Sequence, residues 1–128
     1  MGERLELGPL ELKVLEVLWE RNRASTVRNV QPSFPRLAYT TLMTTLDRLY
    51  RKGVLRRFRF GRAFGYEPCC SRDQLFGQMA SGRVTELLAA CGDSTVLLST
   101  LVEAVGQADA DLLDELETLV RAERARLR

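Results

Sequence analysis

The segment LRRFRFGRAFGYEP, residues 55–68, constrains the fold of this chain more than any other. Aromatic residues recur at every second position on both sides of a glycine, which predicts two strands joined by a tight turn. A three-residue loop would place Phe60 opposite Phe64 and Phe58 opposite Tyr66, so that all four rings share one face. We therefore expect this loop rather than a two-residue turn, which would place Phe58 opposite a glycine.

Four arginines on the same hairpin need an explanation of their own. With a three-residue loop, Arg57 and Arg59 project from the face opposite the rings, and Arg62 lies at the tip. In this arrangement the side chain of Arg56 would lie on the same face as the rings. The pattern gives no reason for a cation at that position. Such positive charge is either a solvated surface or a set of contacts to a polyanion.

Two helical segments are predicted near the N-terminus. The segment LGPLELKVLEVLWERN places Pro9 at a helix start, followed by leucines at three- and four-residue spacing, which predicts an amphipathic helix of about four turns. In the next segment Ser25 or Thr26 can cap a short second helix, which Pro32 and Pro35 should end.

A third helix is predicted for LAYTTLMTTLDRLYRKG, residues 37–53. Leu42, Leu46 and Leu49 lie on one face, and Gly53 stands where a C-terminal cap belongs. The opposite face carries short hydroxyl side chains at its start and cations at its end. This helix therefore has one face for a core and one for a partner.

The two parts of the chain differ in charge. Residues 1–70 carry 13 Lys and Arg against 7 Asp and Glu, whereas residues 71–128 carry 6 against 10, so the first part is basic and the second acidic. Residues 71–128 read as helices throughout, and the segment DSTVLLSTLVEAV is apolar around most of its circumference, as in a helix buried between others. A polyanion is the natural partner of the basic part.

Composition excludes several classes of function. The chain has no histidine, which removes a Cys/His zinc site, a Ser-His-Asp triad and a Cys-His pair. Cys69, Cys70 and Cys91 are odd in number and lack zinc spacing, so we expect no metal, no cofactor and no enzyme activity. No apolar run approaches the roughly 18 residues of a membrane span, and the start does not resemble a signal peptide, so we expect a cytoplasmic protein with no membrane partner.

Three helices followed by a hairpin is the order of a winged helix-turn-helix, in which the third helix enters the major groove and the wing lies along the phosphates. Threonines can contact base edges, and arginines suit phosphates or guanine. We predict a mainly α fold with a small β-hairpin wing, residues 1–70 binding double-stranded DNA and residues 71–128 forming a helical dimerisation domain. The candidate DNA-binding residues are Tyr39, Thr40, Thr41, Thr44, Thr45, Arg48, Arg51 and Lys52 on the third helix, and Arg57, Arg59 and Arg62 on the wing.

The acidic part contains more apolar surface than its own short helices can cover, which predicts a homodimer. Two tethered DNA-binding heads raise the affinity for a repeated site without any new contact to DNA. The candidate dimerisation residues are Leu97, Leu101, Leu113, Leu116, Leu119 and Val120.

Three segments, LGPLELKVLEVLWE, AYTTLMTTLDRLYRKGVL and GRAFGYEP, closely resemble the penicillinase repressor (BlaI/MecI/CopY) family of bacterial transcriptional regulators. The resemblance extends over about residues 7–120. It implies a homodimeric repressor with an N-terminal winged helix and a C-terminal helical dimerisation domain. It also implies binding to inverted-repeat operators, commonly built on TACA and TGTA half-sites, in front of resistance or stress genes.

Two family features are missing from this sequence. Antibiotic-inducible members are cleaved at an Asn-Phe bond through a membrane sensor protease, but this chain has Thr100-Leu101 near that position and no Asn-Phe pair anywhere. Copper-responsive members carry paired cysteines near the C-terminus, and this chain ends RAERARLR. We therefore keep the repressor assignment and expect neither the sensor-protease pathway in its usual form nor copper binding.

Two alternatives remain open on the sequence alone. Winged helices also serve as protein-interaction modules, in which case the wing arginines would meet an acidic protein. A thiol-responsive variant of the repressor would use Cys69, Cys70 or Cys91. A steep loss of DNA binding with added salt would favour the repressor over the protein-interaction module.

Overall fold

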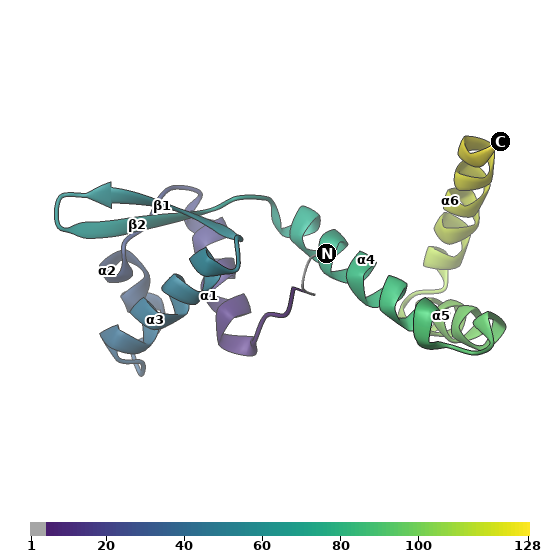
Figure 1. Cartoon of the computed structure of the whole chain (residues 1–128), viewed down its shortest axis with the longest axis horizontal. Coiled ribbons are helices and arrows are strands. Elements are labelled where there is room, and N and C mark those ends of the chain that lie inside the picture. The colour runs from purple at the N-terminus through teal and green to yellow at the C-terminus, as the bar shows by residue number, and fades with distance from the viewer. Residues whose placement is uncertain (1–4) are drawn as a thin grey trace. The chain divides into compact units, whose positions relative to one another are not determined.

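A computed structural model describes residues 5–128 of the chain. Its elements, in order, are α1 (Pro9–Arg21), α2 (Val27–Val30), a 3-10 turn (Gln31–Ser33), α3 (Tyr39–Arg51), β1 (Leu55–Phe60), β2 (Ala63–Pro68), α4 (Arg72–Ala90), α5 (Ser94–Ala108) and α6 (Asp111–Leu127) (Figure 1). This order confirms the predicted fold class, a mainly helical chain with a two-stranded hairpin. No helix among the described residues is long and apolar enough to cross a membrane.

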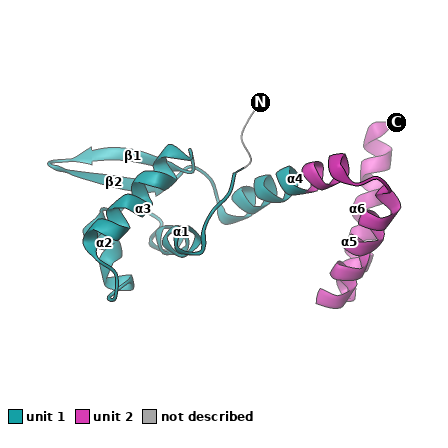
Figure 2. Cartoon of the chain, turned by 60° about the horizontal axis from the view of Figure 1, so that its bottom comes forward, with its two compact units in different colours: residues 1–83 teal, residues 84–128 magenta. Residues whose placement is uncertain are grey.

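The chain divides into two compact units (Figure 2). Unit 1 is Met1–Arg83, of which residues 5–83 are described, and unit 2 is Val84–Arg128. The division lies inside α4, later than the expected boundary between residues 70 and 71. The reason is that Leu75 of α4 is completely buried in the core of unit 1, and Met79 packs against that core.

Helix α1 begins and ends through local hydrogen bonds. The backbone N–H of Gly8 donates to the Glu11 carboxylate at 2.9 Å, and Pro9 occupies the first helical turn, where its missing N–H costs nothing. At the other end Asn22 takes the left-handed conformation, with φ of 51°, and its N–H donates to the carbonyl of Leu18.

The second helix is capped by Thr26 and not by Ser25. The Thr26 hydroxyl accepts from the N–H of Asn29 at 3.3 Å, and the Asn29 side chain accepts from the N–H of Thr26 at 2.9 Å. Ser25 instead pairs with Tyr66 of β2, with both N–H to carbonyl distances at 2.8 Å. This single bridge fixes the hairpin to the segment before α2.

A single apolar core holds unit 1 together. Leu42, Leu46 and Leu49 of α3 have no exposed surface, as the sequence pattern predicts, and α3 is followed by its C-cap Lys52 and by Gly53, which has a φ of 83°. All buried apolar residues of the described chain belong to this core: Val14, Leu15, Leu18, Val27, Val30, Leu42, Leu46, Leu49, Val54, Leu55, Tyr66 and Leu75.

The predicted register of the hairpin is wrong. Phe60 pairs with Ala63 across a two-residue turn, so Phe58 lies opposite Gly65 and Arg59 opposite Phe64. The turn is this short because Gly61 takes a φ of 58°, which suits the first central position of a tight hairpin turn. A glycine at position 65 suits this register, because the ring of Phe60 covers it so closely that a Cβ there would collide with the ring.

The corrected register divides the aromatic residues between two faces. Phe64 and Tyr66 share one face with Arg57 and Arg59, whereas Phe58 and Phe60 lie on the other, where they are 40% and 51% exposed. The predicted four-ring face and the opposite placement of the two arginines are therefore both wrong.

Arg56 has a partner that the sequence did not reveal. It lies opposite Glu67 in the corrected register, and the two side chains form an ion pair at 2.9 Å across the strands. The parity of Arg56 is thus accounted for by a cross-strand pair of opposite charges.

Unit 2 consists of the end of α4 with α5 and α6. The side chain of Asp93 caps α5 by accepting from the N–H of Thr95 at 2.9 Å. Helices α5 and α6 approach closely where Gly106 faces Leu113, since a Cβ at position 106 would lie 3.2 Å from the leucine Cδ1.

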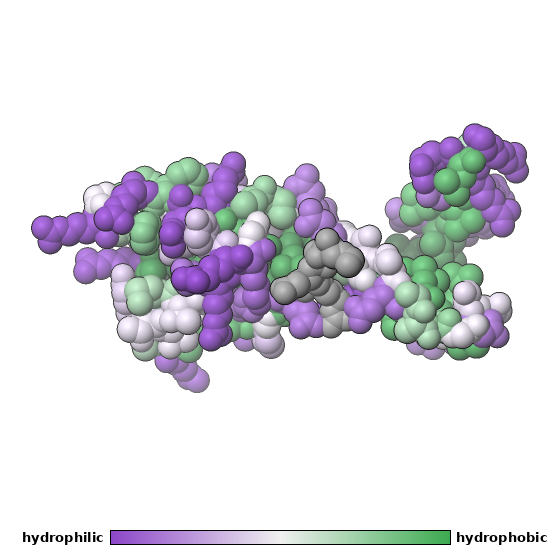
Figure 3. All heavy atoms as spheres, viewed as in Figure 1, coloured by the Kyte–Doolittle hydropathy of each residue, from purple (hydrophilic) through white to green (hydrophobic). Residues whose placement is uncertain are grey.

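No residue of unit 2 is buried within one copy of the chain. The expected burial of α5 between other helices is therefore not met by the chain's own residues. Hydrophobic surface is prominent over α5 in the space-filling view (Figure 3). The large apolar side chains left exposed in unit 2 are Leu87, Leu88, Val96, Leu98, Leu101, Val102, Leu112, Leu113, Leu119, Val120 and Leu127.

Candidate nucleic-acid interface

The outward face of α3 carries a row of small polar side chains that ends in a cation. Thr40, Thr44 and Arg48 follow one another at four-residue spacing, so they lie on one side of the helix, and all three are exposed. Thr41 and Tyr39 are exposed beside this row. No acceptor among residues 5–128 pairs with the Arg48 guanidinium, which leaves it available to a ligand.

Thr45 does not belong to this surface. Its side chain is only 6% exposed, and its hydroxyl donates to the carbonyl of Thr41 in the preceding turn at 2.8 Å. The expectation that it faces outward with the other threonines is wrong, because it stands three residues after Leu42 and four before Leu49, on the buried side of the helix.

The cations at the end of α3 are engaged within unit 1. Arg51 pairs with Asp47 one turn earlier at 2.8 Å, although its side chain remains 77% exposed. Lys52 donates to the Glu11 carboxylate at 2.9 Å and to the carbonyl of Glu6 at 2.8 Å. Lys52 therefore links the end of α3 to α1 and to the segment before α1. The ion pair of Arg51 with Asp47 is a weak surface pair, so Arg51 can give it up to bind a phosphate.

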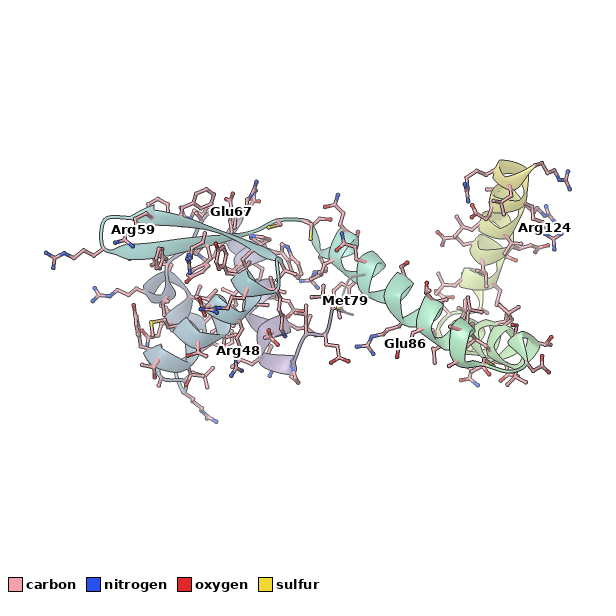
Figure 4. The ribbon with its side chains drawn as sticks, viewed as in Figure 1. Arg48, Arg59, Glu67, Met79, Glu86 and Arg124 are labelled. Carbon is pink, nitrogen blue, oxygen red and sulfur yellow. The ribbon has the colours of Figure 1, made fainter. Side chains whose placement is uncertain are left out.

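The three wing arginines have different surroundings. Arg59 and Arg62 are exposed and make no ion pair with any described residue (Figure 4, which labels Arg59 on the hairpin and Arg48 on α3). Arg57 is only 27% exposed, lies on the face turned toward α3, and approaches Asp47 at 3.5 Å. Two of the three predicted wing cations therefore have no ion-pair partner among the described residues.

A hollow of about 290 Å³ separates the wing tip from α2 and α3. Arg28 of α2 and Arg62 of the turn both line it, together with Tyr39 and Met43 of α3. Arg28 and Met43 were missed by the sequence reasoning. Arg28 could have been noticed in the sequence, because it stands two residues after the Thr26 cap and therefore in the first turn of the predicted short helix.

Burial shifts the pKa of two groups at or just after the wing, Tyr66 and Cys70. Burial raises the pKa of Tyr66, and the neighbouring Arg57 opposes this by lowering it. Burial, with a smaller effect of Cys69, also raises the pKa of the Cys70 thiol. Raised thiol pKa values disfavour the reactive thiolate, so Cys70 gains nothing as a nucleophile from its position.

Among residues 5–128 no cluster of three or more carboxylate or cysteine side chains is arranged to hold a metal ion. Cys69 is exposed, and Cys91 donates from its Sγ to the carbonyl of Asp93 at 3.0 Å. The thiol-responsive alternative stays an untested prediction.

Comparison with known proteins identifies relatives of most of the chain. The family model described as penicillinase repressor matches residues 7–122. The transcriptional regulator BlaI of Mycobacterium tuberculosis (strain H37Rv) is 37% identical over 119 residues, which cover 91% of this chain and 83% of that protein.

Two solved structures of BlaI proteins also match. The solution structure of the DNA-binding domain of the repressor BlaI is 27% identical, covers 56% of this chain and 90% of that one, and gives a TM-score of 0.48. The solution structure of monomeric Bacillus licheniformis BlaI in complex with the blaP half-operator is 26% identical, covers 57% and 92%, and gives a TM-score of 0.45. From the family model and the sequence identity, the chain belongs to the penicillinase repressor family, whose members are transcriptional repressors and not enzymes.

Proposed function

We propose that this protein is a repressor that binds an inverted-repeat operator as a homodimer, each copy placing α3 in the major groove and its wing along the phosphates. One observation carries the proposal: the exposed row of Thr40, Thr44 and Arg48 stands on the same unit as two unpaired wing arginines, Arg59 and Arg62. The groove needs side chains short enough for close approach, and the backbone needs unpaired cations. Unit 1 supplies both.

The charges near α3 support this docking. An aspartate at position 47 would repel phosphates, but Arg51 and Arg57 both pair with it. The surface offered to DNA is therefore positive despite the carboxylate. Family resemblance supplies the operator chemistry, commonly TACA and TGTA half-sites, and the control of resistance or stress genes.

The homodimer is supported by unit 2. Leu97 and Leu116 are half-buried within one copy, and Leu101, Leu113, Leu119 and Val120 are exposed, so a second copy has an apolar surface to cover. Many exposed apolar side chains on one small unit favour an association site. Joining two heads in this way makes binding of the second half-site nearly intramolecular.

Base reading is tested with a duplex that carries TACA and TGTA as an inverted repeat and with a scrambled duplex of the same composition. Thr44→Ala and Arg48→Ala should each reduce the ratio of the two affinities, because a direct base contact is worth about 1–3 kcal/mol. Competition binding at constant salt measures the ratio. An unchanged ratio in both variants would show that α3 does not read sequence.

Phosphate contacts by the wing are tested through salt dependence. Arg59→Gln with Arg62→Gln should weaken binding to both duplexes alike and reduce the salt slope by about 0.9 for each lost contact. Arg124→Gln, on α6 in unit 2, is the matched control and should leave the slope unchanged (Figure 4). A slope that the wing variants leave intact would favour the protein-interaction module instead.

Release from DNA by the usual cleavage is not part of the proposal. The sequence has no Asn-Phe bond, and Thr100-Leu101 near the expected position lies within α5, where the Thr100 hydroxyl donates to the carbonyl of Val96 at 2.8 Å. If a sensor-protease pathway acts on this protein, it does so at a different bond.

A further inference from the structure

Arg57 has surroundings unlike those of the other wing arginines. Its guanidinium carbon lies 4.1 Å from the centroid of the Tyr50 ring and 4.2 Å from that of the Phe64 ring. Tyr50 belongs to α3 and Phe64 to β2, so one cation contacts a ring from the helix and a ring from the wing. Such contacts are attractive because the face of an aromatic ring carries negative potential.

A carboxylate completes these contacts. The Nη1 of Arg57 lies 3.5 Å from the Oδ1 of Asp47 on α3, while the other oxygen of Asp47 accepts from Arg51. Arg57 also lines a hollow of about 280 Å³ together with Met43 and Thr44 of α3. The side chain thus reaches from the middle of β1 to the part of α3 that carries the proposed base-reading residue Thr44.

We propose that Arg57 is a positioning residue, which fixes the wing against α3 and so sets the spacing between the base-reading and phosphate-binding side chains. The proposal rests on the proposed DNA binding and offers a different role for Arg57 from the phosphate contact expected from the sequence. The wing and α3 must meet the backbone and the groove of one half-site at the same time. A wing held in place before DNA arrives loses less freedom on binding, and this preorganisation raises affinity.

The chemistry of the contact separates a positioning role from a phosphate contact. A flat guanidinium can lie against two rings while it pairs with a carboxylate, and a lysine ammonium cannot reproduce that geometry. A lysine can, however, replace an arginine as a cation beside a phosphate. Arg57→Lys and Arg57→Gln should therefore behave alike if Arg57 positions the wing, and differently if it contacts DNA.

The first arm of the test needs no DNA. Amide hydrogen exchange of β1 and β2 should become faster in Arg57→Gln and in Arg57→Lys, by about 2- to 30-fold, the range expected for the loss of cation–π contacts. Arg59→Gln is the matched control, because Arg59 is exposed and its guanidinium carbon is 5.1 Å from one ring only. Equal protection in the wild type and both Arg57 variants would overturn the proposal.

The second arm measures binding to the TACA/TGTA duplex across a range of salt concentrations. Both Arg57 variants should lose affinity about 2- to 30-fold per half-site with an unchanged salt slope, because the ordering cost and not a phosphate contact has changed. A slope reduced by about 0.9 in Arg57→Gln and restored in Arg57→Lys would overturn the proposal in favour of a direct contact.

Variants of Tyr50 distinguish loss of the contact with Arg57 from general unfolding of unit 1. Tyr50→Phe keeps the ring and should bind as the wild type does, whereas Tyr50→Leu should resemble Arg57→Gln, and the double variant should lose no more than either one. Additive losses would overturn the proposal. If the wild type fails to bind the duplex, the proposed function fails, while hydrogen exchange still decides whether Arg57 holds the wing.

Discussion

Helices α3 and α6 both carry leucines at three- and four-residue spacing, yet only the α3 leucines are buried. Leu42, Leu46 and Leu49 of α3 have no exposed surface, whereas Leu113 and Leu119 of α6 are 36% and 59% exposed. The same pattern therefore predicts an apolar partner in both cases without saying which chain supplies it. For α3 the partner is the rest of unit 1, and for α6 we infer a second copy.

The two units as a whole differ in the same way as these two helices. Unit 1 surrounds its core with three helices, a hairpin and the first turns of α4, and its leucines and valines of α3, α2 and β1 are buried there although several aromatic side chains remain exposed. Unit 2 has no buried residue of its own. One copy of unit 1 therefore has its own apolar core, and we infer that unit 2 gains its stability from association with a second copy.

The largest expected effect comes from a charge placed in the leucine stripe of α6, which consists of Leu113, Leu116, Leu119 and Val120. Leu116→Glu should convert the dimer to a monomer, because a carboxylate in an apolar interface has no partner. Operator affinity should then fall by about 10²–10⁴-fold, since the two heads are no longer joined. Analytical ultracentrifugation measures the first effect, and binding to the TACA/TGTA duplex measures the second.

Thr118→Glu is the matched control for this variant. Thr118 is exposed on the same helix, two residues away and outside the leucine stripe, and its hydroxyl donates to the carbonyl of Asp114 at 3.1 Å. The control should remain a dimer and bind DNA at near wild-type affinity. A Leu116→Glu protein that stays dimeric, or a wild type that is monomeric at micromolar concentration, would contradict the role given to unit 2.

The converse change tests whether unit 1 is self-sufficient. Leu46→Ala removes a completely buried side chain of α3 and should lower the free energy of unfolding of unit 1 by about 2–5 kcal/mol. The variant should still form a dimer, because unit 2 is unchanged. Trp19, the only tryptophan, reports unfolding of unit 1 by fluorescence, since its indole donates to the Cys70 carbonyl at 3.0 Å.

Leu127→Ala gives the same chemical change at a side chain that is 68% exposed. It should alter stability by no more than about 0.5 kcal/mol. If Leu46→Ala produced a monomer while unit 1 was still folded, association would depend on the core of unit 1, and the two units would not be as separate as the comparison requires.

Local sequence rules predicted most of the fold. The cap at Ser25 or Thr26, the glycine after α3 and the buried leucines each follow from interactions within one or two helical turns, although the choice of Thr26 over Ser25 needed the structure. The strand register was not predictable in this way. It depends on the turn at Gly61 and on the contact between Phe60 and Gly65, and the assumption that rings prefer rings opposite them outweighed both.

The candidate site was predicted less well than the fold. Exposure of Thr44 and Arg48 follows from the helical period. Thr45 lies at the edge of the buried face, where a small rotation of the helix about its axis determines whether the side chain is buried or exposed. The partners of Lys52 and Arg57 come from other elements, α1 for the first and α3 with β2 for the second. No pattern within a single helix or strand could reveal them.

The smallest expected effect tests the corrected register inside unit 1. Gly65 does not have a positive φ, so alanine there meets no backbone strain, and the only obstacle is the Phe60 ring. That ring is 51% exposed and can turn into solvent, so Gly65→Ala should destabilise unit 1 by only about 1 kcal/mol, at the low end for an overpacked site. Denaturant unfolding followed by Trp19 fluorescence measures the change.

The pair of residues can be separated by a second substitution. Phe60→Ala removes the ring, so Gly65→Ala should cost almost nothing in that background, and the two changes should be clearly non-additive. Gly77→Ala in α4 is the control, because apart from its chain neighbours and the backbone of its own helix nothing lies within 4 Å of the added Cβ, and it should stabilise unit 1 by about 0.4–1 kcal/mol. In the predicted three-residue loop Phe60 would instead face Phe64, and Gly65→Ala would be indifferent to the residue at position 60. If the effects of the two substitutions on the free energy of unfolding were additive, the three-residue loop would be favoured, and with it the placement of Arg57 and Arg59 away from α3.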